Sequence, residues 1–396
     1  MSVARGDAVG LTRELVRVDS RNPSLVMGGP GEGAVARALA EILRAWGFRA
    51  ELHEVAPGRP NVVARAGSNA GEDATGGRSL MFNGHLDVVG IDGMRHAPWG
   101  AEVLDGRIYG RGASDMKAGV AAMCAAASRA ADASADIDVV IAAVVDEEFE
   151  SAGTRSVIGR GVRADAAIVT EPTRLAIMPA HLGFVWADIV THGRAAHGSR
   201  WDLGVDAIRH SGVILAELDR FDAEQLPAAP HPLLGRPSIH ASLIEGGTGM
   251  STYPDRCVTR IERRTVPGET PEGVRRELED LCRRAATRRP GLHADVIVTF
   301  SQAPSDVAVE APIVRAVDAA LRAAGEAPRV EGMTAWTDAA LLNAAGIPAI
   351  CFGPGDITLA HAAEEYVEID EIERATEVLA RLAVQWCDGS GGPWHT

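Results

Sequence analysis

Cysteine is scarce in this chain of 396 residues, and no two cysteines form a CxxC pair. The five cysteines are Cys124, Cys257, Cys282, Cys351 and Cys387. An odd and scattered set does not predict a disulfide framework, and it is typical of a protein that works in a reducing cytosol. We therefore expect a cytoplasmic protein with free thiols.

Long apolar runs are also absent. Segment 1–20 has no apolar signal core, and no later run is long enough to span a membrane. The formal net charge of -15 argues against nucleic acid or an anionic membrane surface as a partner. The same charge favours solubility and would also attract a cationic substrate. These features predict a soluble protein that binds neither nucleic acid nor membrane.

A nucleotide-binding loop is the third missing feature. Gly110–Gly119 (GRGASDMKAG) is rich in glycine but lacks the GxxxxGK[ST] pattern of a phosphate loop. Asp115 in this stretch comes just before an Ala-rich helix expected over 116–131, where a carboxylate gains from the helix dipole. This aspartate is therefore either an N-cap of that helix or a functional ligand.

The stretch Met81–Asp87 (MFNGHLD) is the first that points to chemistry. It continues a short apolar run typical of a buried strand and ends with His85 and Asp87 one residue apart. Residues i and i+2 of a strand point to the same side, so the imidazole can be a metal ligand or base that the carboxylate holds in place. A core histidine beside a solvated aspartate is the alternative.

Two further apolar runs end in carboxylates. Segment 138–145 (DVVIAAVV) is typical of a strand buried on both faces, and the DEE motif at 146–148 follows it. Segment 165–169 is followed by Glu171. Open α/β sheets place their sites at this edge, and adjacent carboxylates that repel one another favour a bound cation. A solvated loop is the alternative for the DEE motif.

The middle of the chain has a different pattern. Its predicted elements cover 184–191, 204–218, 238–244, 256–265, 270–286 and 294–300. Their order, βαββαβ, is that of the split ferredoxin-like unit. We therefore predict an α/β fold with a mostly parallel sheet in a catalytic domain (1–179 and 302–396). An inserted α+β lid or dimerisation domain covers 180–301.

Five candidate metal ligands are spread along the chain. They are His85, Asp115, Glu148, Glu171 and His361. Two imidazoles and three carboxylates are too many for one tetrahedral zinc ion, but they suffice for two ions if one carboxylate bridges. Glu147 is adjacent to a ligand and spare, so we assign it as the general base for a shared water. We predict two Zn²⁺ ions, with Co²⁺ or Mn²⁺ as alternatives.

Together these motifs resemble the M20 family of metallohydrolases. HLDVVG, GRGASDMKAG, DEE, TEPT and GPGDITLAH occur in the family's order and cover almost the whole chain. The resemblance implies that Asp115 is the bridging ligand, that Asp87 accompanies His85, and that the peptide bond after Asp115 is cis. In the segment THGRAAHGS it implies that His197 reaches across a homodimer and stabilises the oxyanion at the partner's site.

The resemblance also narrows the reaction. Glu171 is similar to the deacylase members, which favours hydrolysis of the amide bond of an N-acyl-L-amino acid. Segment 251–270 resembles the acetylornithine deacetylase branch, and Arg264 is its candidate for binding a substrate carboxylate, with a solvated strand position as the alternative. The competing activities are those of a succinyl-diaminopimelate desuccinylase, a broad aminoacylase and an M20 di- or carboxypeptidase. A non-catalytic binding protein on the same scaffold is the non-enzyme alternative.

Overall fold

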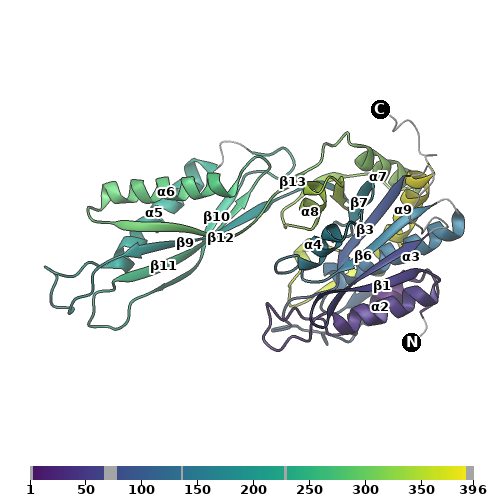
Figure 1. The fold of residues 1–396 in the computed structure, drawn as a ribbon, viewed down its shortest axis with the longest axis horizontal. Helices are drawn as coiled ribbons and strands as arrows, with labels where there is room; N and C mark the ends of the chain where they lie inside the picture. The colour runs from purple at the N-terminus through teal and green to yellow at the C-terminus, as the bar shows by residue number, and fades with distance from the viewer. Residues whose placement is uncertain (1–2, 67–77, 135–136, 227–229, 389–396) are drawn as a thin grey trace. The chain divides into compact units, whose positions relative to one another are not determined.

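The apolar runs that end in carboxylates form the centre of one mixed sheet. The computed structural model describes residues 3–66, 78–134, 137–226 and 230–388. The sheet has the strand order β1-β2-β6-β3-β7-β15-β8. Figure 1 labels β1, β6, β3 and β7 of this sheet. Its strands are β1 (Arg49–Ala56), β2 (Arg59–Ala66), β3 (Ser79–His85), β6 (Asp138–Val144), β7 (Ala166–Val169), β8 (Ile177–His181) and β15 (Ala349–Cys351). Because β6, β3, β7 and β15 are parallel neighbours, the predicted α/β class with a mostly parallel central sheet is confirmed.

Helices pack around this sheet. They are α1 (Ala8–Val16), α2 (Gly33–Ala45), α3 (Ala118–Ala133), α4 (Ala152–Gly159), α7 (Pro312–Ala323), α8 (Ala339–Ala344) and α9 (Ile369–Cys387), with short helical turns η1 (Ala113–Lys117) and η3 (Ile357–Leu359). Among the residues that the structure describes, no helix combines the length and the apolar character that a membrane crossing requires.

Helix α3 approaches the strand ends very closely. It is rich in alanine, the strongest helix former, and it is buried along most of its length. A Cβ added at Gly119 would lie 1.9 Å from the carbonyl oxygen of Thr170, so only glycine fits there. This contact brings the start of α3 beside the end of β7.

A small sheet joins distant parts of the chain. It consists of β4 (Glu102–Leu104), β5 (Arg107–Tyr109) and β16 (Tyr366–Glu368), in the order β16-β5-β4. Tyr366 is the partner of Tyr109 in the antiparallel pair, and their rings lie 5.3 Å apart. The pairing places the segment before β16 next to the segment after β5.

The chain divides into two units. The first comprises Met1–Pro179, Val307–Glu331 and Thr337–Thr396, and the second comprises Ala180–Asp306 and Gly332–Trp336. The second unit has a four-stranded antiparallel sheet in the order β10-β11-β9-β12, with α5 and α6 on one face. Its elements are β9 (Gly183–His192), α5 (Ala207–Glu224), β10 (Ser238–Gly246), β11 (Arg256–Thr265), α6 (Pro271–Arg288) and β12 (His293–Gln302).

The second unit extends beyond the boundary predicted at residue 301. It includes the short strand β13 (Ser305–Asp306) and the end of β14 (Val330–Met333), whose first two residues belong to the first unit. Both strands pair with β8. The Trp336 indole also donates a hydrogen bond to the carbonyl of Ala303 at 3.0 Å. Pairings of so few residues leave no periodic pattern in a sequence, which is why the domain prediction assigned 302–306 and 332–336 to the first domain.

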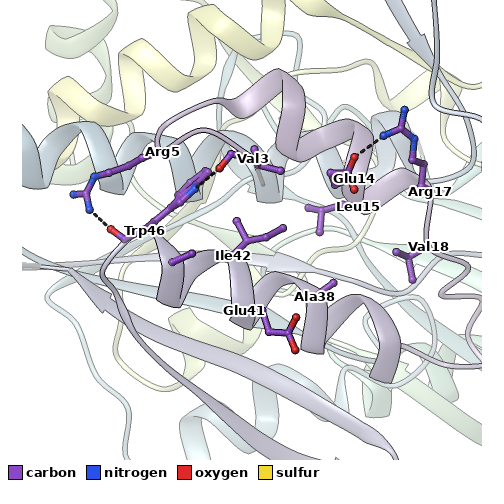
Figure 2. A pocket seen from close by; sticks show the side chains of 11 residues that line it. Val3, Arg5, Glu14, Leu15, Arg17, Val18, Ala38, Glu41, Ile42 and Trp46 are labelled. Carbon is purple, nitrogen blue, oxygen red and sulfur yellow. Dashed lines mark hydrogen bonds and ion pairs between the residues drawn. The ribbon is translucent and has the colours of Figure 1, made fainter. Parts of the chain in front are cut away.

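A cavity of about 430 Å³ lies between α1 and α2 (Figure 2). Leu15, Ile42 and Trp46 supply apolar parts of its wall, and the Trp46 indole donates to the carbonyl of Val3 at 3.1 Å. None of the predicted site residues lines this cavity. It is therefore separate from the cluster described next.

Candidate active site

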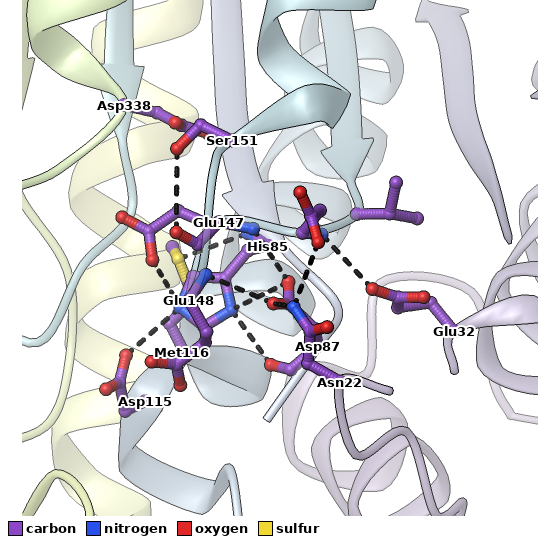
Figure 3. A network of polar contacts seen from close by, with 12 residues as sticks. Asn22, Glu32, His85, Asp87, Asp115, Met116, Glu147, Glu148, Ser151 and Asp338 are labelled. Atoms are coloured by element: carbon purple, nitrogen blue, oxygen red, sulfur yellow. Dashed lines mark hydrogen bonds and ion pairs between the residues drawn. The ribbon is translucent and has the colours of Figure 1, made fainter. Parts of the chain in front are cut away.

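Parallel register brings the predicted residues to one edge of the sheet. His85 is the last residue of β3 and pairs with Val144 at the end of β6, while β7 pairs with the other side of β3. The carboxylates that follow β6 and β7 therefore reach the imidazole, as Figure 3 shows for Glu147. One potential ligand atom each from His85, Glu147 and Glu171 lie within 4.8 Å of one another.

A second potential ligand group shares His85. The Nε2 atom of His85 lies 3.1 Å from Oδ1 of Asp115. One potential ligand atom each from His85, Asp115 and Glu148 lie within 4.8 Å of one another. His361 has a left-handed backbone conformation with φ of 61°, and its Nε2 lies 3.0 Å from Glu148 Oε2 and 3.5 Å from Asp115 Oδ2. Each oxygen of Asp115 thus faces a different histidine. The two groups contain four of the five predicted ligands together with Glu147, and the fifth, His361, contacts Glu148 and Asp115 of the second group.

Asp87 supports the cluster in a different way from the one predicted. Nδ1 of His85 lies 2.9 Å from the backbone carbonyl oxygen of Asp87, whereas the nearest carboxylate oxygen is 3.7 Å away. That carboxylate instead accepts hydrogen bonds from the backbone N–H groups of Glu147 and Glu148, both at 3.1 Å, and from the Asn22 amide at 2.9 Å. The predicted carboxylate–imidazole hydrogen bond is corrected accordingly: Asp87 holds the turn that carries Glu147.

We expect Asp87→Ala to lower turnover about 10- to 100-fold, as loss of an outer-shell partner does. The free energy of unfolding should fall by about 1–3 kcal/mol, because two backbone N–H groups lose their acceptor. Steady-state kinetics and urea unfolding measure the two effects. Asp87→Asn keeps an oxygen acceptor and the side-chain volume. Its turnover and its free energy of unfolding should therefore fall less than those of Asp87→Ala. Wild-type turnover in Asp87→Ala would contradict this positioning role.

The turn after β6 also depends on residues that sequence reasoning missed. Asp146 has φ of 67°, and its carboxylate accepts hydrogen bonds from Asn22 at 3.1 Å and Arg59 at 3.0 Å. Arg59 in turn pairs with the fully buried Glu32. Asn22 and Glu32 lie in the Gly- and Pro-rich segment 20–33, whose composition is typical of an exposed loop. Composition therefore concealed their role.

Glu365 also supports the cluster, through contacts that the sequence did not indicate. Its carboxylate accepts from the backbone N–H groups of Ser114 at 3.0 Å and Asp115 at 3.2 Å, and it pairs with Arg111 at 2.7 Å. Burial raises the pKa of Glu365 to about 7. The peptide bond between Asp115 and Met116 is cis, as the family resemblance implied. No pattern around Glu365 distinguishes it from a surface glutamate.

Charges in the cluster shift one another's pKa values strongly. Burial alone would lower the pKa of His85, but the facing carboxylates, first that of Asp115, raise it well above 6.5. Burial raises the pKa values of Glu147 and Glu171 well above the ordinary value of 4.5, and neighbouring carboxylates add to the shift. Hydrogen bonds to Asp115 and a nearby glutamate raise the pKa of His361 to about 10.

These shifts describe carboxylates that are crowded in a buried space without sufficient positive charge. Divalent cations would stabilise the ionised carboxylates and the neutral imidazoles. Oxygen and nitrogen donors in this ratio suit zinc, cobalt or manganese. The residues present therefore fit a metal centre. Only Nε2 of His85 is available to an ion, because its Nδ1 contacts the Asp87 carbonyl. Places for two ions are offered by His85 with Glu171 and by His361 with Glu148, on either side of Asp115.

The pKa shifts predict how the metal-free protein responds to pH. A carboxyl with a raised folded-state pKa contributes less to the free energy of unfolding as pH rises from about 4.5 through that pKa. The contribution of His361 is present below about 6.5 and is lost as pH rises through about 10. Both effects lower the free energy of unfolding as pH rises.

We therefore expect the Tm of chelator-treated protein to fall as pH rises from about 6 to 9, and that of zinc-loaded protein to fall less. Calorimetry of both forms in matched buffers measures the difference. A difference in Tm that does not change with pH would contradict the coupling between metal and protons.

The remaining predicted residues, His197 and Arg264, belong to the second unit. His197 is exposed, and its Nδ1 lies 2.9 Å from Ser199 Oγ. Nε of Arg264 lies 2.6 Å from Glu262, and its guanidinium lies over the Phe184 ring at 5.3 Å. These two contacts restrict the Arg264 side chain, so it is not freely solvated. Substrate binding by Arg264 and oxyanion stabilisation by His197 both stay predictions.

The sequence matches the model of "Peptidase family M20/M25/M40" over residues 81–385. Acetylornithine deacetylase from Myxococcus xanthus is 32% identical over 357 residues, a match that covers 88% of this chain and 90% of that protein. N-formyl-4-amino-5-aminomethyl-2-methylpyrimidine deformylase from Bacillus subtilis (strain 168) is 29% identical over 379 residues, with 88% of each chain covered.

The fold is also similar to that of solved structures. The YXEP protein of Bacillus subtilis, described as a dinuclear metal-binding peptidase from the M20 family, superimposes with a TM-score of 0.72 at 17% identity. The match covers 96% of this chain and 98% of that one. At this identity the likeness shows a shared fold, and the nature of the site must be argued from the residues above.

Proposed function

The chain belongs to peptidase family M20/M25/M40 and is a metal-dependent hydrolase of amide bonds, and from this premise we propose that it deacylates an N-acyl-L-amino acid. The observation that carries the proposal is the position of Glu147, whose side chain is only 10% exposed and whose Oε2 lies 4.0 Å from His85 Nε2. N-acetylornithine is the proposed substrate, supported by the Myxococcus xanthus relative and by glutamate rather than aspartate at position 171.

The proposed chemistry needs a base that changes its protonation state. Glu147 accepts a proton from the attacking water at its carboxylate and then delivers that proton to the amine as the C–N bond breaks. Its raised pKa in a buried setting suits both steps, because a stronger carboxylate base takes the proton more readily. Asp87 fixes its backbone N–H and so keeps the carboxylate directed at the cluster.

Two divalent ions, which we propose to be zinc, would lower the pKa of the attacking water and polarise the scissile carbonyl. The proposed ligands are His85, Asp115, Glu148, Glu171 and His361. Asp115 is the candidate bridge, because its two oxygens face His85 and His361 separately.

Five buried free cysteines in the chain support the predicted reducing compartment, the cytoplasm.

Amine release from a panel of substrates tests the proposal. The zinc-loaded protein is given N-acetylornithine, N-succinyl-diaminopimelate, neutral N-acetyl and N-formyl amino acids, and a dipeptide. A preference for N-acetylornithine is the expected result. Broad activity on neutral N-acetyl amino acids would indicate an aminoacylase instead, and a preference for the succinyl substrate would indicate a desuccinylase. Cleavage of the dipeptide alone would overturn the proposal.

We also propose that the enzyme is a homodimer in which His197 stabilises the oxyanion at its partner's site. His197→Ala and Glu147→Gln homodimers should each be nearly inactive. Mixed dimers made by co-refolding should recover about a quarter of wild-type activity, because half of the dimers are hybrids with one complete site. A mixture no more active than its components would contradict action across the dimer, and sedimentation would show whether the dimer forms.

A further inference from the structure

Two histidines and an aspartate that could hold a metal ion lie in the second unit, on the sheet face opposite α5 and α6. His192 ends β9, His293 begins β12, and the two residues are direct partners in the antiparallel pair. Asp295 is two residues further along β12, so it points to the same face. Ile189 and Val296 instead point to the helices and belong to their core. The strand ladder therefore fixes where the three polar side chains lie.

Distances within this group suit a single ion. Nε2 of His192 lies 2.8 Å from Oδ2 of Asp295, and the two imidazole rings lie 5.1 Å apart. One potential ligand atom from each of His192, His293 and Asp295 lie within 4.8 Å of one another. Ligands of a tetrahedral zinc ion are about 3.3 Å apart when the bonds are about 2.0 Å. Small rotations of the side chains would reach that geometry.

We propose that His192, His293 and Asp295 form a binding site for a divalent transition-metal ion such as Zn²⁺, separate from the active site. Zinc, copper and nickel bind a donor set of two imidazoles and one carboxylate more readily than calcium or magnesium does. The site is accessible, because the side chains of His192 and Asp295 are 42% and 58% exposed. A bound ion would tie β12, the edge strand of this sheet, to β9.

A positive neighbour limits the affinity of this site. Arg256 of β11 is the direct partner of His192 on the other side of β9, and directly opposite residues share a face. Its charge opposes that of an incoming cation. Nε2 of His192 and Oδ2 of Asp295 already lie 2.8 Å apart on this exposed face.

Zinc binding by the full-length protein tests this proposal. Equilibrium dialysis against Zn²⁺ is compared for wild type, His293→Ala and His240→Ala. His240 is the matched control, since it is an exposed histidine on β10 of the same sheet. We expect His293→Ala to bind about one Zn²⁺ fewer per chain, and His240→Ala to bind as many as wild type. Equal binding by wild type and His293→Ala, or equal losses in both variants, would overturn the proposal.

Two further readouts separate this site from the active site. Arg256→Ala should bind the additional Zn²⁺ more tightly, because the opposing charge is gone. His293→Ala should keep the amide-hydrolysing activity of wild type, since none of the three ligands is part of the catalytic cluster. An additional zinc ion that is lost together with activity in His293→Ala would assign that ion to the active site and overturn the proposal.

Discussion

Glu147→Gln is expected to lower kcat by about 10²- to 10⁴-fold while metal content stays at the wild-type level. Glutamine has nearly the same shape as glutamate, and the backbone N–H of residue 147 still donates to Asp87. What is lost is the ability to accept the proton of the attacking water. Steady-state kinetics and metal analysis of the same preparation measure the two quantities together.

The structure makes this a sharp test, because Glu147 has two potential roles. A carboxylate oxygen of Glu147 lies within 4.8 Å of the potential ligand atoms of His85 and Glu171, so Glu147 is also placed to bind an ion directly. A loss of metal along with activity would show that Glu147 is a ligand rather than the base. Glu150→Gln is the matched control: this glutamate lies in the same turn but is exposed, and both quantities should stay unchanged.

Asp115→Asn is expected to reduce activity by at least about 10³-fold and to deplete metal from both positions. The carboxylate places one oxygen 3.1 Å from His85 and the other 3.5 Å from His361. An amide offers a single oxygen and no charge, so it cannot bridge two ions. The fold should persist, because Glu365 contacts the backbone at this position rather than the side chain.

His361→Ala provides the comparison for Asp115→Asn. His361 contacts only one of the two proposed ligand groups, the group that contains Glu148. We therefore expect His361→Ala to lower metal content by about half, and Asp115→Asn to lower it further. Equal metal loss in the two variants would contradict the assignment of Asp115 as the bridge.

The sequence alone indicated which residues gather in the candidate active site. Apolar strands that end in His85, in the DEE motif or before Glu171 are local patterns, and parallel strands must place such ends at one edge. Local patterns also predicted the βαββαβ order of the second unit, since helices and strands differ in period. Burial of His85, Asp115 and Glu171 follows from the same runs, whereas Glu148 is partly exposed and His361 is exposed.

Only the tertiary structure decided which groups support that cluster. Asp87 and His85 are neighbours in sequence, yet the carboxylate bonds to the turn after β6, because that turn lies directly beside it. Glu365 reaches Asp115 only through the pairing of β16 with β5. Each of these contacts joins residues far apart in the chain, and hydrophobic periodicity carries no information about such partners.

The same reason explains why the second metal group was not predicted. His192 and His293 are separated by a whole supersecondary unit and become neighbours only in the register of β9 and β12. A strand pattern predicts which face a side chain occupies, but the register between strands determines what it meets. The sequence therefore determined the fold class and the members of the candidate cluster, and the strand pairing decided their supports and the group of His192, His293 and Asp295.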